Sequence, residues 1–371
     1  MSQNVRKIDR LFLFSVIALT IVGFVIFLSA SMGLLAQDGA SFGGVAAKQG
    51  ISLVLGIIAF IIFSKINYTF WRRFAFFVLI FAFILNLLLF IPGISLEHGG
   101  ASRWINLGFL TFQPSEFLKI AAIIYIAAWL QHAKENIKTV KFGLIPFIII
   151  SSIIGFLLLA QPDTDTFVVI FVTGLIMFSL AGMAFRHIAL LILLMGIVLV
   201  GVIAFRPYAL NRVTTLLNGG SDEQGAGYQI NQSLIAIGSG QLSGRGFGQS
   251  IQKFGYLPQP TDDSIFAVAG EEFGFIGSIF LIGLYLLFAI ASFRIGTRSR
   301  DIFGSFLVIG IATLIIIQSF LNMAAMLGIL PLFGMPLLFV SHGGTALIIT
   351  LAATGIIANV SRRSNTQVYT E

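Results

Sequence analysis

The sequence contains no cysteine and little charge: only 10% of its 371 residues are Asp, Glu, Lys or Arg. The absence of cysteine excludes disulfide bonds, thiolate nucleophiles and cysteine-ligated metal centres. Soluble domains carry about 25% charged residues, so this chain lacks the polar surface that a water-soluble fold needs. With 57% hydrophobic residues and a mean hydropathy of +0.99, the composition predicts a protein that folds in a lipid bilayer.

Long apolar runs fill most of the chain. A transmembrane helix needs roughly 20 apolar residues, because each rises about 1.5 Å through a hydrocarbon layer about 30 Å thick. Helices satisfy their own backbone hydrogen bonds in lipid. We therefore expect an all-α polytopic membrane protein of about ten transmembrane helices, forming a single domain over residues 1–371. The predicted spans are Leu11–Ala30, Gln49–Ser64, Ala75–Pro92, Phe117–Gln131, Gly143–Gln161, Phe167–Phe185, Ile188–Phe205, Ser264–Phe293, Ile302–Gly328 and Thr345–Val360.

The distribution of lysine and arginine predicts the orientation, because cytoplasmic loops of membrane proteins are enriched in both. Most of the 22 basic residues lie in residues 1–10, in the tail 361–371 and in the short loops on the same side of ten spans. We therefore expect both termini in the cytoplasm. The net charge of +7 is scattered between apolar runs, so no nucleic-acid partner is expected.

The outer loops are richer in polar residues, glycine and proline, so function is expected on the outer face. The largest, residues 206–263, joins spans seven and eight. It contains an amphipathic stretch, Tyr228–Ile237, which is expected to lie partly along the membrane surface.

A second polar segment runs from Arg103 to the start of span four. Pro114 suits the first turn of a helix, and Glu116 complements the exposed amides there. Lys119 lies inside the apolar run, where an unpaired charge costs a few kcal/mol. Arg103 and Lys119 are expected to hold a phosphate or diphosphate. The alternative is an interfacial turn anchored by Trp104.

Two further outer segments carry charge. Asp163 and Asp165 lie in a short turn after Gln161, where one would cap the next helix or both would hold a divalent cation such as Mg or Mn. Arg245 and Lys253 lie in a glycine-rich segment, where backbone amides can approach a ligand. The alternative for that segment is a plain flexible loop.

A cluster of carboxylates marks the entry to span eight. Asp262 and Asp263 precede the span, while Glu271 and Glu272 lie inside it and require cationic partners such as Arg103, Lys119 or Arg245. A carboxylate at the water interface of an apolar cavity is well placed as a general base. The alternatives are an N-cap for Asp262 and a structural ion pair for one glutamate.

The last polar segment, Ser341–Thr345, opens span ten. Its Gly343–Gly344 turn exposes amides at a helix N-terminus, which favours an anion. Ser341 beside His342 does not indicate a serine hydrolase, because neighbours in sequence do not make a catalytic triad.

Taken together, these segments resemble the SEDS family of cell-wall polymerases, the group of RodA, FtsW and SpoVE. The resemblance covers nearly the whole chain. It is carried by Arg103–Gly108 with Gln113–Glu116, Gln232–Gly240, Gly246–Lys253, Ile265–Val268 with Gly270–Gly274, and Ser341 with Gly343–Gly344.

The resemblance implies a peptidoglycan glycosyltransferase that polymerises lipid II on the outer face of the bacterial cytoplasmic membrane, for elongation or division. It implies a class B penicillin-binding protein as partner. It also implies a catalytic aspartate: alignment on Ile265 selects Asp263, which we prefer, whereas alignment on Thr261 selects Asp262. The substrate-binding residues are then expected among Arg103, Glu116, Lys119, Gln161, Asp163, Arg245, Lys253, Ser341, Gly343 and Gly344.

The chain also departs from the family pattern. Family members usually have His-Thr-Asp at residues 261–263, Gly at Asp165 and Tyr at His342. Two other functions stay open at this stage. One is a flippase for the lipid-linked precursor, and the other is a scaffold without catalytic activity.

Overall fold

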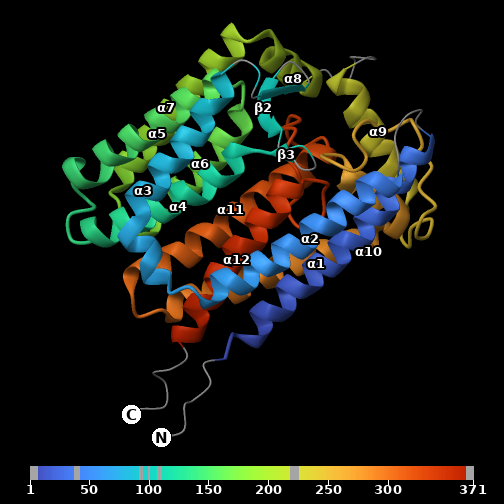
Figure 1. Cartoon of the computed structure of the whole chain (residues 1–371). Helices are drawn as coiled ribbons and strands as arrows, with labels where there is room; N and C mark the ends of the chain where they lie inside the picture. The colour runs from blue at the N-terminus through green and yellow to red at the C-terminus, as the bar shows by residue number, and fades with distance from the viewer. Residues whose placement is uncertain are drawn as a thin grey trace, which may run out of the picture.

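The computed structural model is a helical bundle and describes residues 7–36, 42–91, 93, 95–98, 101–106, 108, 111–217 and 225–364 (Figure 1). Within these residues, eight helices are long and apolar enough to cross a membrane. The chain is therefore a multi-pass, all-α membrane protein, as expected. The eight helices are α1 (Arg10–Ser31), α2 (Phe42–Lys65), α3 (Tyr68–Leu87), α5 (Ile145–Ala160, preceded by the π-helical turn Val140–Leu144), α7 (Phe185–Phe205), α10 (Ile265–Arg298), α11 (Ile302–Met326) and α12 (Gly344–Ser364).

Two more helices, α4 (Pro114–Ala133) and α6 (Thr164–Leu180), pack inside the same bundle. The first carries Glu116 and Lys119 near its start, and the second has only 17 residues. These two helices coincide with the fourth and sixth predicted spans. The number of ten crossings stays a prediction.

The start of α1 and the end of α12 lie at the same end of the bundle (Figure 1). The backbone N–H of Asp9 donates to the hydroxyl of Ser361 at 2.9 Å, and the Asp9 carboxylate pairs with Arg294 at 2.8 Å. Because α12 ends at Ser364, the first residues of the predicted tail 361–371 belong to this helix. That both termini face the cytoplasm stays a prediction.

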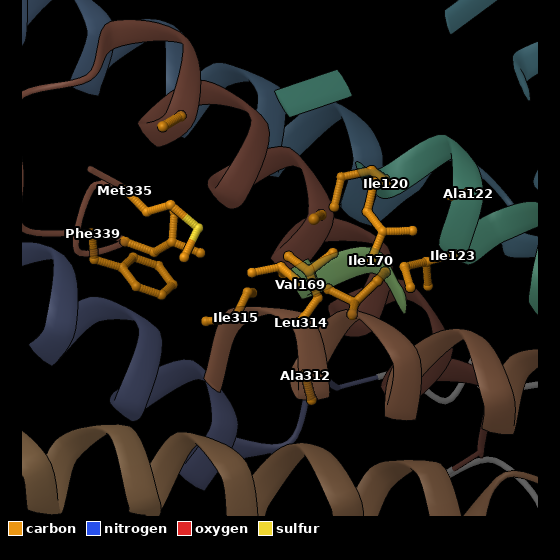
Figure 2. Close-up of a cluster of buried hydrophobic side chains, with 14 of the residues drawn as sticks. Ile120, Ala122, Ile123, Val169, Ile170, Ala312, Leu314, Ile315, Met335 and Phe339 are labelled. Atoms are coloured by element: carbon orange, nitrogen blue, oxygen red, sulfur yellow. The ribbon is translucent and has the colours of Figure 1, made fainter. Parts of the chain in front are cut away.

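The centre of the bundle is formed by α11 and α12, where 72% of the apolar window is buried, against 11% for α7. Figure 2 shows side chains of α4, α6 and α11 together with the segment between α11 and α12. These apolar groups form the core, whereas the mostly unburied α7 lies at the rim of the bundle. The labelled residues of this core are Ile120, Ala122, Ile123, Val169, Ile170, Ala312, Leu314, Ile315, Met335 and Phe339.

A small antiparallel sheet lies at the opposite end of the bundle, together with α8 (Pro207–Leu217) and α9 (Ala226–Ser239) (Figure 1). Its strands β1 (Ser95–His98), β2 (Ala101–Asn106) and β3 (Thr111–Phe112) follow in order, and Ile105 pairs with Phe112. The sheet was not predicted: the sequence was interpreted there as a polar loop that binds phosphate, with an interfacial turn as the alternative. The strands satisfy the backbone hydrogen bonds of a chain that leaves the helices, and they lead into α4, where Pro114 lies in the first turn as predicted.

The long helix α10 is broken at Gly274, whose φ of 64° is left-handed. The glycine-rich segment 240–246 fits against this break: the backbone N–H groups of Arg245 and Gly246 donate to the carbonyls of Glu271 and Glu272. A Cβ on Gly274 would lie 2.3 Å from the nitrogen of Gly244. These backbone amides were expected to approach a ligand; in the structure the amides of Arg245 and Gly246 bond to α10 instead.

Candidate functional site

The loop Thr261–Ser264, at the start of α10, is held in place by two other parts of the bundle. Asn322 of α11 donates a side-chain hydrogen bond to the carbonyl of Asp263 at 2.8 Å. The backbone N–H of His342 donates to the carbonyl of Thr261 at 2.8 Å. The hydroxyl of Ser341 donates to the carbonyl of Asp262. The position of the two adjacent aspartates is thus fixed by residues far away in sequence.

The two aspartates have different surroundings. The Asp262 carboxylate pairs with His342 Nδ1 at 3.4 Å, and its side chain is 41% exposed. The Gln229 side chain of α9, which donates to the Ser264 hydroxyl at 2.9 Å, acts on the Asp263 carboxylate. Its Oδ1 atom is buried and has no hydrogen-bond partner within the described residues. Of the two aspartates, Asp263 is therefore the one with a carboxylate oxygen that can accept a hydrogen bond from a ligand.

Burial raises the pKa of Asp263 from its ordinary 3.8 to about 6, and the negative charge of Asp262 adds to the increase. The hydrogen bond from Gln229 and the charge of Arg212 oppose it. A carboxylate with a pKa just below neutral is largely ionised at pH 7 and still basic enough to accept a proton. This is the condition required of a general base, and it supports Asp263 over Asp262.

Of the cations expected to pair with the glutamates of α10, Arg245 does so, and among the described residues none of Arg103, Lys119 and Arg245 forms an ion pair with Asp263. Lys119 donates to Glu116 Oε1 at 2.8 Å and to Gln318, and its side chain is only 3% exposed. Arg245 lies 3.4 Å from Glu271. A cation whose charge acts on Asp263 is Arg212 on α8; it is the weakest of the influences named for that carboxyl group, and the guanidinium itself pairs with Asp165. Sequence reasoning missed Arg212, because only the folding back of the large loop brings α8 to the aspartate.

The glutamates of α10 form a buried network that holds the large loop. Glu271 accepts hydrogen bonds from the Ser250 hydroxyl at 2.6 Å and from two backbone N–H groups of the same loop. Glu272 accepts from the Ser29 hydroxyl at 2.6 Å and from Lys253 Nζ at 2.7 Å. The Lys253 side chain is 0% exposed. Lys253 was expected to contact the substrate, but its buried ammonium group is paired with Glu272 and does not face an open site.

A second group of charges surrounds the first turn of α6. The guanidinium of Arg103 donates to the carbonyl of Pro162, and Gln161 donates to the carbonyl of Asn86 at 2.9 Å. Asp163 Oδ1 caps α6 by accepting from the N–H of Thr166 at 3.4 Å. The prediction that one of these carboxylates caps the helix is confirmed.

The remaining carboxylates of this group face different surroundings. Asp163 Oδ2 is buried without a hydrogen-bond partner in the described part of the chain. Asp165 Oδ2 lies 3.3 Å from Arg212 Nη1. Arg212 therefore connects the α6 turn with the surroundings of Asp263. Among the residues that the structure describes, no group of three or more His, Asp or Glu side chains is arranged to hold a metal ion.

The segment before α12 supports the aspartate loop. The Ser341 hydroxyl donates to Asp262, as above, and accepts from the N–H of Leu337 at 2.8 Å. This hydroxyl is thus used for positioning, which disfavours the expected contact with substrate. Gly344 begins α12 as expected, with Gly343 directly before it. An anion at this turn stays a prediction.

An apolar cavity of about 490 Å³ opens at the surface of the bundle, lined by side chains of α1 and α2, several of them exposed, and by Leu351 of α12. A second cavity, of about 250 Å³, is lined by Pro162, Thr164 and Arg206 together with apolar residues of α5 and α7. The second cavity lies directly beside the α6 turn. The carbonyl of Pro162 therefore links Arg103 to the wall of this cavity.

The chain is similar to known proteins over almost its full length. Residues 9–366 match the family FTSW_RODA_SPOVE, described as cell cycle protein. The chain is 37% identical over 370 residues to the probable peptidoglycan glycosyltransferase FtsW of Geobacter sulfurreducens, covering 97% of both chains. It is 37% identical over 319 residues to stage V sporulation protein E of Bacillus subtilis, covering 86% of this chain and 87% of the relative.

Two solved structures share the fold at 24% sequence identity. One, described as the structural coordination of polymerization and crosslinking by a peptidoglycan synthase complex, has a TM-score of 0.78 and covers 97% of this chain and 99% of its own. The other, the rod shape determining protein RodA of Thermus thermophilus, has a TM-score of 0.69 and covers 96% and 97%. The family match and the curated relatives together show that this chain belongs to the FtsW/RodA/SpoVE family, the SEDS proteins.

Proposed function

We propose that this protein is a peptidoglycan glycosyltransferase that polymerises lipid II into glycan strands. The observation that carries the proposal is the buried carboxylate of Asp263, whose Oδ1 has no hydrogen-bond partner among the described residues. The name of the Geobacter relative, probable peptidoglycan glycosyltransferase, supports the reaction class. The active face is the outer face of a bacterial cytoplasmic membrane, since the glycan product is assembled outside the cell.

The proposed reaction needs one base and a cationic site for the leaving group. Asp263 accepts the proton of an acceptor sugar hydroxyl, and the hydroxyl oxygen bonds to the anomeric carbon of the donor sugar. The bond from that carbon to the diphosphate breaks, and the lipid diphosphate leaves with the bonding electron pair. General-base catalysis contributes roughly 10² to 10⁴ in rate. Arg212, which acts on Asp263 in the unliganded protein, is positioned to stabilise the charge of the leaving group.

The lipid part of the substrate requires an apolar surface. We assign it to the membrane-embedded faces of the bundle, with the apolar cavity between α1, α2 and α12 as a site for a hydrocarbon chain. Membrane lipids can occupy the same surface. The polar headgroup would then reach the end of the bundle that carries α8 and α9 (Figure 1).

A divalent cation, Mg or Mn, is part of the proposal. Asp163 would hold it through the buried Oδ2 atom that has no hydrogen-bond partner in the described part of the chain. When bound, such an ion would neutralise charge on a diphosphate. Chelation by EDTA should then reduce polymerisation, and restoring Mg or Mn should recover it. Full activity in EDTA would exclude the cation.

The decisive experiment uses purified full-length protein in vesicles with lipid II, and measures glycan strands on a gel. Asp263→Ala should make no polymer, while Asp262→Ala, the matched neighbour, should retain activity. Thermal unfolding in detergent checks that both variants fold. Polymerisation by Asp263→Ala at the wild-type rate would disprove the assignment.

The same vesicles distinguish the alternatives. A flippase would move labelled lipid II across the bilayer without forming strands, and a scaffold would do neither. We also propose a class B penicillin-binding protein as partner. The name of one structural neighbour, a synthase complex that coordinates polymerization and crosslinking, supports a crosslinking partner. Co-purification of the two proteins from one membrane would test it.

A further inference from the structure

Arg212 lies where three parts of the molecule meet. Its Nη1 atom is 3.3 Å from Asp165 Oδ2 in the first turn of α6. Its charge acts on Asp263 before α10. A Cβ built on Gly334, in the segment between α11 and α12, would lie 3.4 Å from its Nη2 atom. The guanidinium is thus positioned by α8 between the proposed base and the α6 turn.

A second arginine acts on the same turn. The charges of both Arg103 and Arg212 act on Asp165. Arg103 donates one hydrogen bond to Pro162, and its Nε atom is buried without a partner within the described residues. Two guanidiniums beside the N-terminal amides of a helix are the groups that bind phosphates in proteins.

In this structure a carboxylate lies against Arg212, and the charge of Arg103 also acts on that carboxylate. The Asp165 side chain is 6% exposed, and such a buried carboxylate is costly without a cationic partner. Asp163 beside it is also buried and leaves Oδ2 without a partner among the described residues.

We propose that Arg103 and Arg212 form a diphosphate-binding site, and that Asp165 occupies it as a built-in competitor until a diphosphate displaces it. The inference rests on the proposed function, because the diphosphate is that of the lipid-linked substrate or product. Displacement places the diphosphate on Arg212, beside Asp263. Asp165 then sets how tightly the outer face holds a leaving diphosphate.

The test measures binding rather than polymerisation. Calorimetry on the full-length protein in detergent would titrate farnesyl diphosphate, with farnesol as the control that lacks phosphate. Asp165→Asn should bind farnesyl diphosphate about tenfold more tightly than wild type, because one competing charge is removed at constant shape. Arg212→Ala should bind at least about tenfold more weakly, with Arg212→Lys between it and wild type. Glu135→Gln, which removes an exposed charge beyond the far end of α4, should match wild type.

The outcomes are separable. If wild type and Asp165→Asn bind farnesyl diphosphate equally well, Asp165 is not a competitor. If Arg212→Ala binds it as tightly as wild type, Arg212 is not part of a diphosphate site. A parallel change in farnesol binding would also overturn it, because the effect would then come from the hydrocarbon tail. If Arg212→Ala does not fold, Arg212→Lys and Asp165→Asn decide the question. If the expected affinities are found but wild type makes no glycan from lipid II, the proposed function fails and the diphosphate site stands.

Discussion

Replacing Asp263 with Asn should remove activity and, at the same time, stabilise the folded protein. The reason is the raised pKa: burial moves the pKa of Asp263 from 3.8 to about 6. Below pH 4 the carboxyl group is protonated in both the folded and the unfolded chain. As the pH rises from 4 to 6, the unfolded chain releases the proton while the folded chain retains it, so the folded state loses stability.

The magnitude follows from the size of the shift. Each pKa unit corresponds to about 1.4 kcal/mol, so ionising the buried carboxylate costs up to about 3 kcal/mol of folding free energy above pH 6. Asn keeps the shape of the side chain and carries no charge. At pH 7.5 Asp263→Asn should therefore be more stable than wild type by up to about 3 kcal/mol, and this difference should fall below about 1 kcal/mol near pH 4 and vanish at still lower pH.

The assay is thermal unfolding in detergent across pH 4 to 8, recorded for both proteins under the same conditions. A rise of several degrees in Tm is expected for the variant at pH 7.5, with the difference disappearing at low pH. Asp262→Asn is the matched control, because its carboxylate is more exposed and pairs with His342. An Asp263→Asn variant that is less stable than wild type at pH 7.5 would refute the interpretation of Asp263 as a costly buried base.

Three further predictions concern the same end of the molecule. The acid limb of kcat/KM against pH should have its midpoint at about 6 and move to lower pH in Asp262→Asn, since the neighbouring charge raises the pKa of Asp263; an unmoved limb would argue against Asp263 as the titrating base. Lys253→Met leaves Glu272 without its cation and should cost about 3–5 kcal/mol in denaturant unfolding, with partial recovery on adding Glu272→Gln. Gly274→Ala should lower Tm, because its Cβ would overlap the backbone of segment 240–246; an unchanged Tm would show that the break in α10 can relax.

Much of the architecture follows from the sequence alone. Apolar runs of about 20 residues specify membrane helices because the bilayer leaves no other way to satisfy the backbone. Pro114 at the start of α4 and the capping Asp163 are local signals, so they were predicted correctly. The small sheet was missed, because its strands are short and depend on pairing between segments.

The partners of the charged side chains could not be predicted from sequence. Contacts such as Ser29 with Glu272 or Asn322 with Asp263 join residues far apart in the chain. The sequence offered several cations for the aspartates, and only packing decides which of them is near. It places Arg212 there and assigns Lys119 and Lys253 to glutamates of their own.

The sequence by itself determined that this chain crosses a membrane many times, which family it resembles and which segments between the spans carry charge. Hydrophobicity and local motifs are properties of consecutive residues, so they can be recognised without a fold. The tertiary structure alone decided that Asp263, rather than Asp262, has a buried carboxylate oxygen without a hydrogen-bond partner in the described residues, and that the charge of Arg212 on α8 acts on it. Burial and charge pairing depend on distances between distant segments, and those distances exist only once the helices have packed.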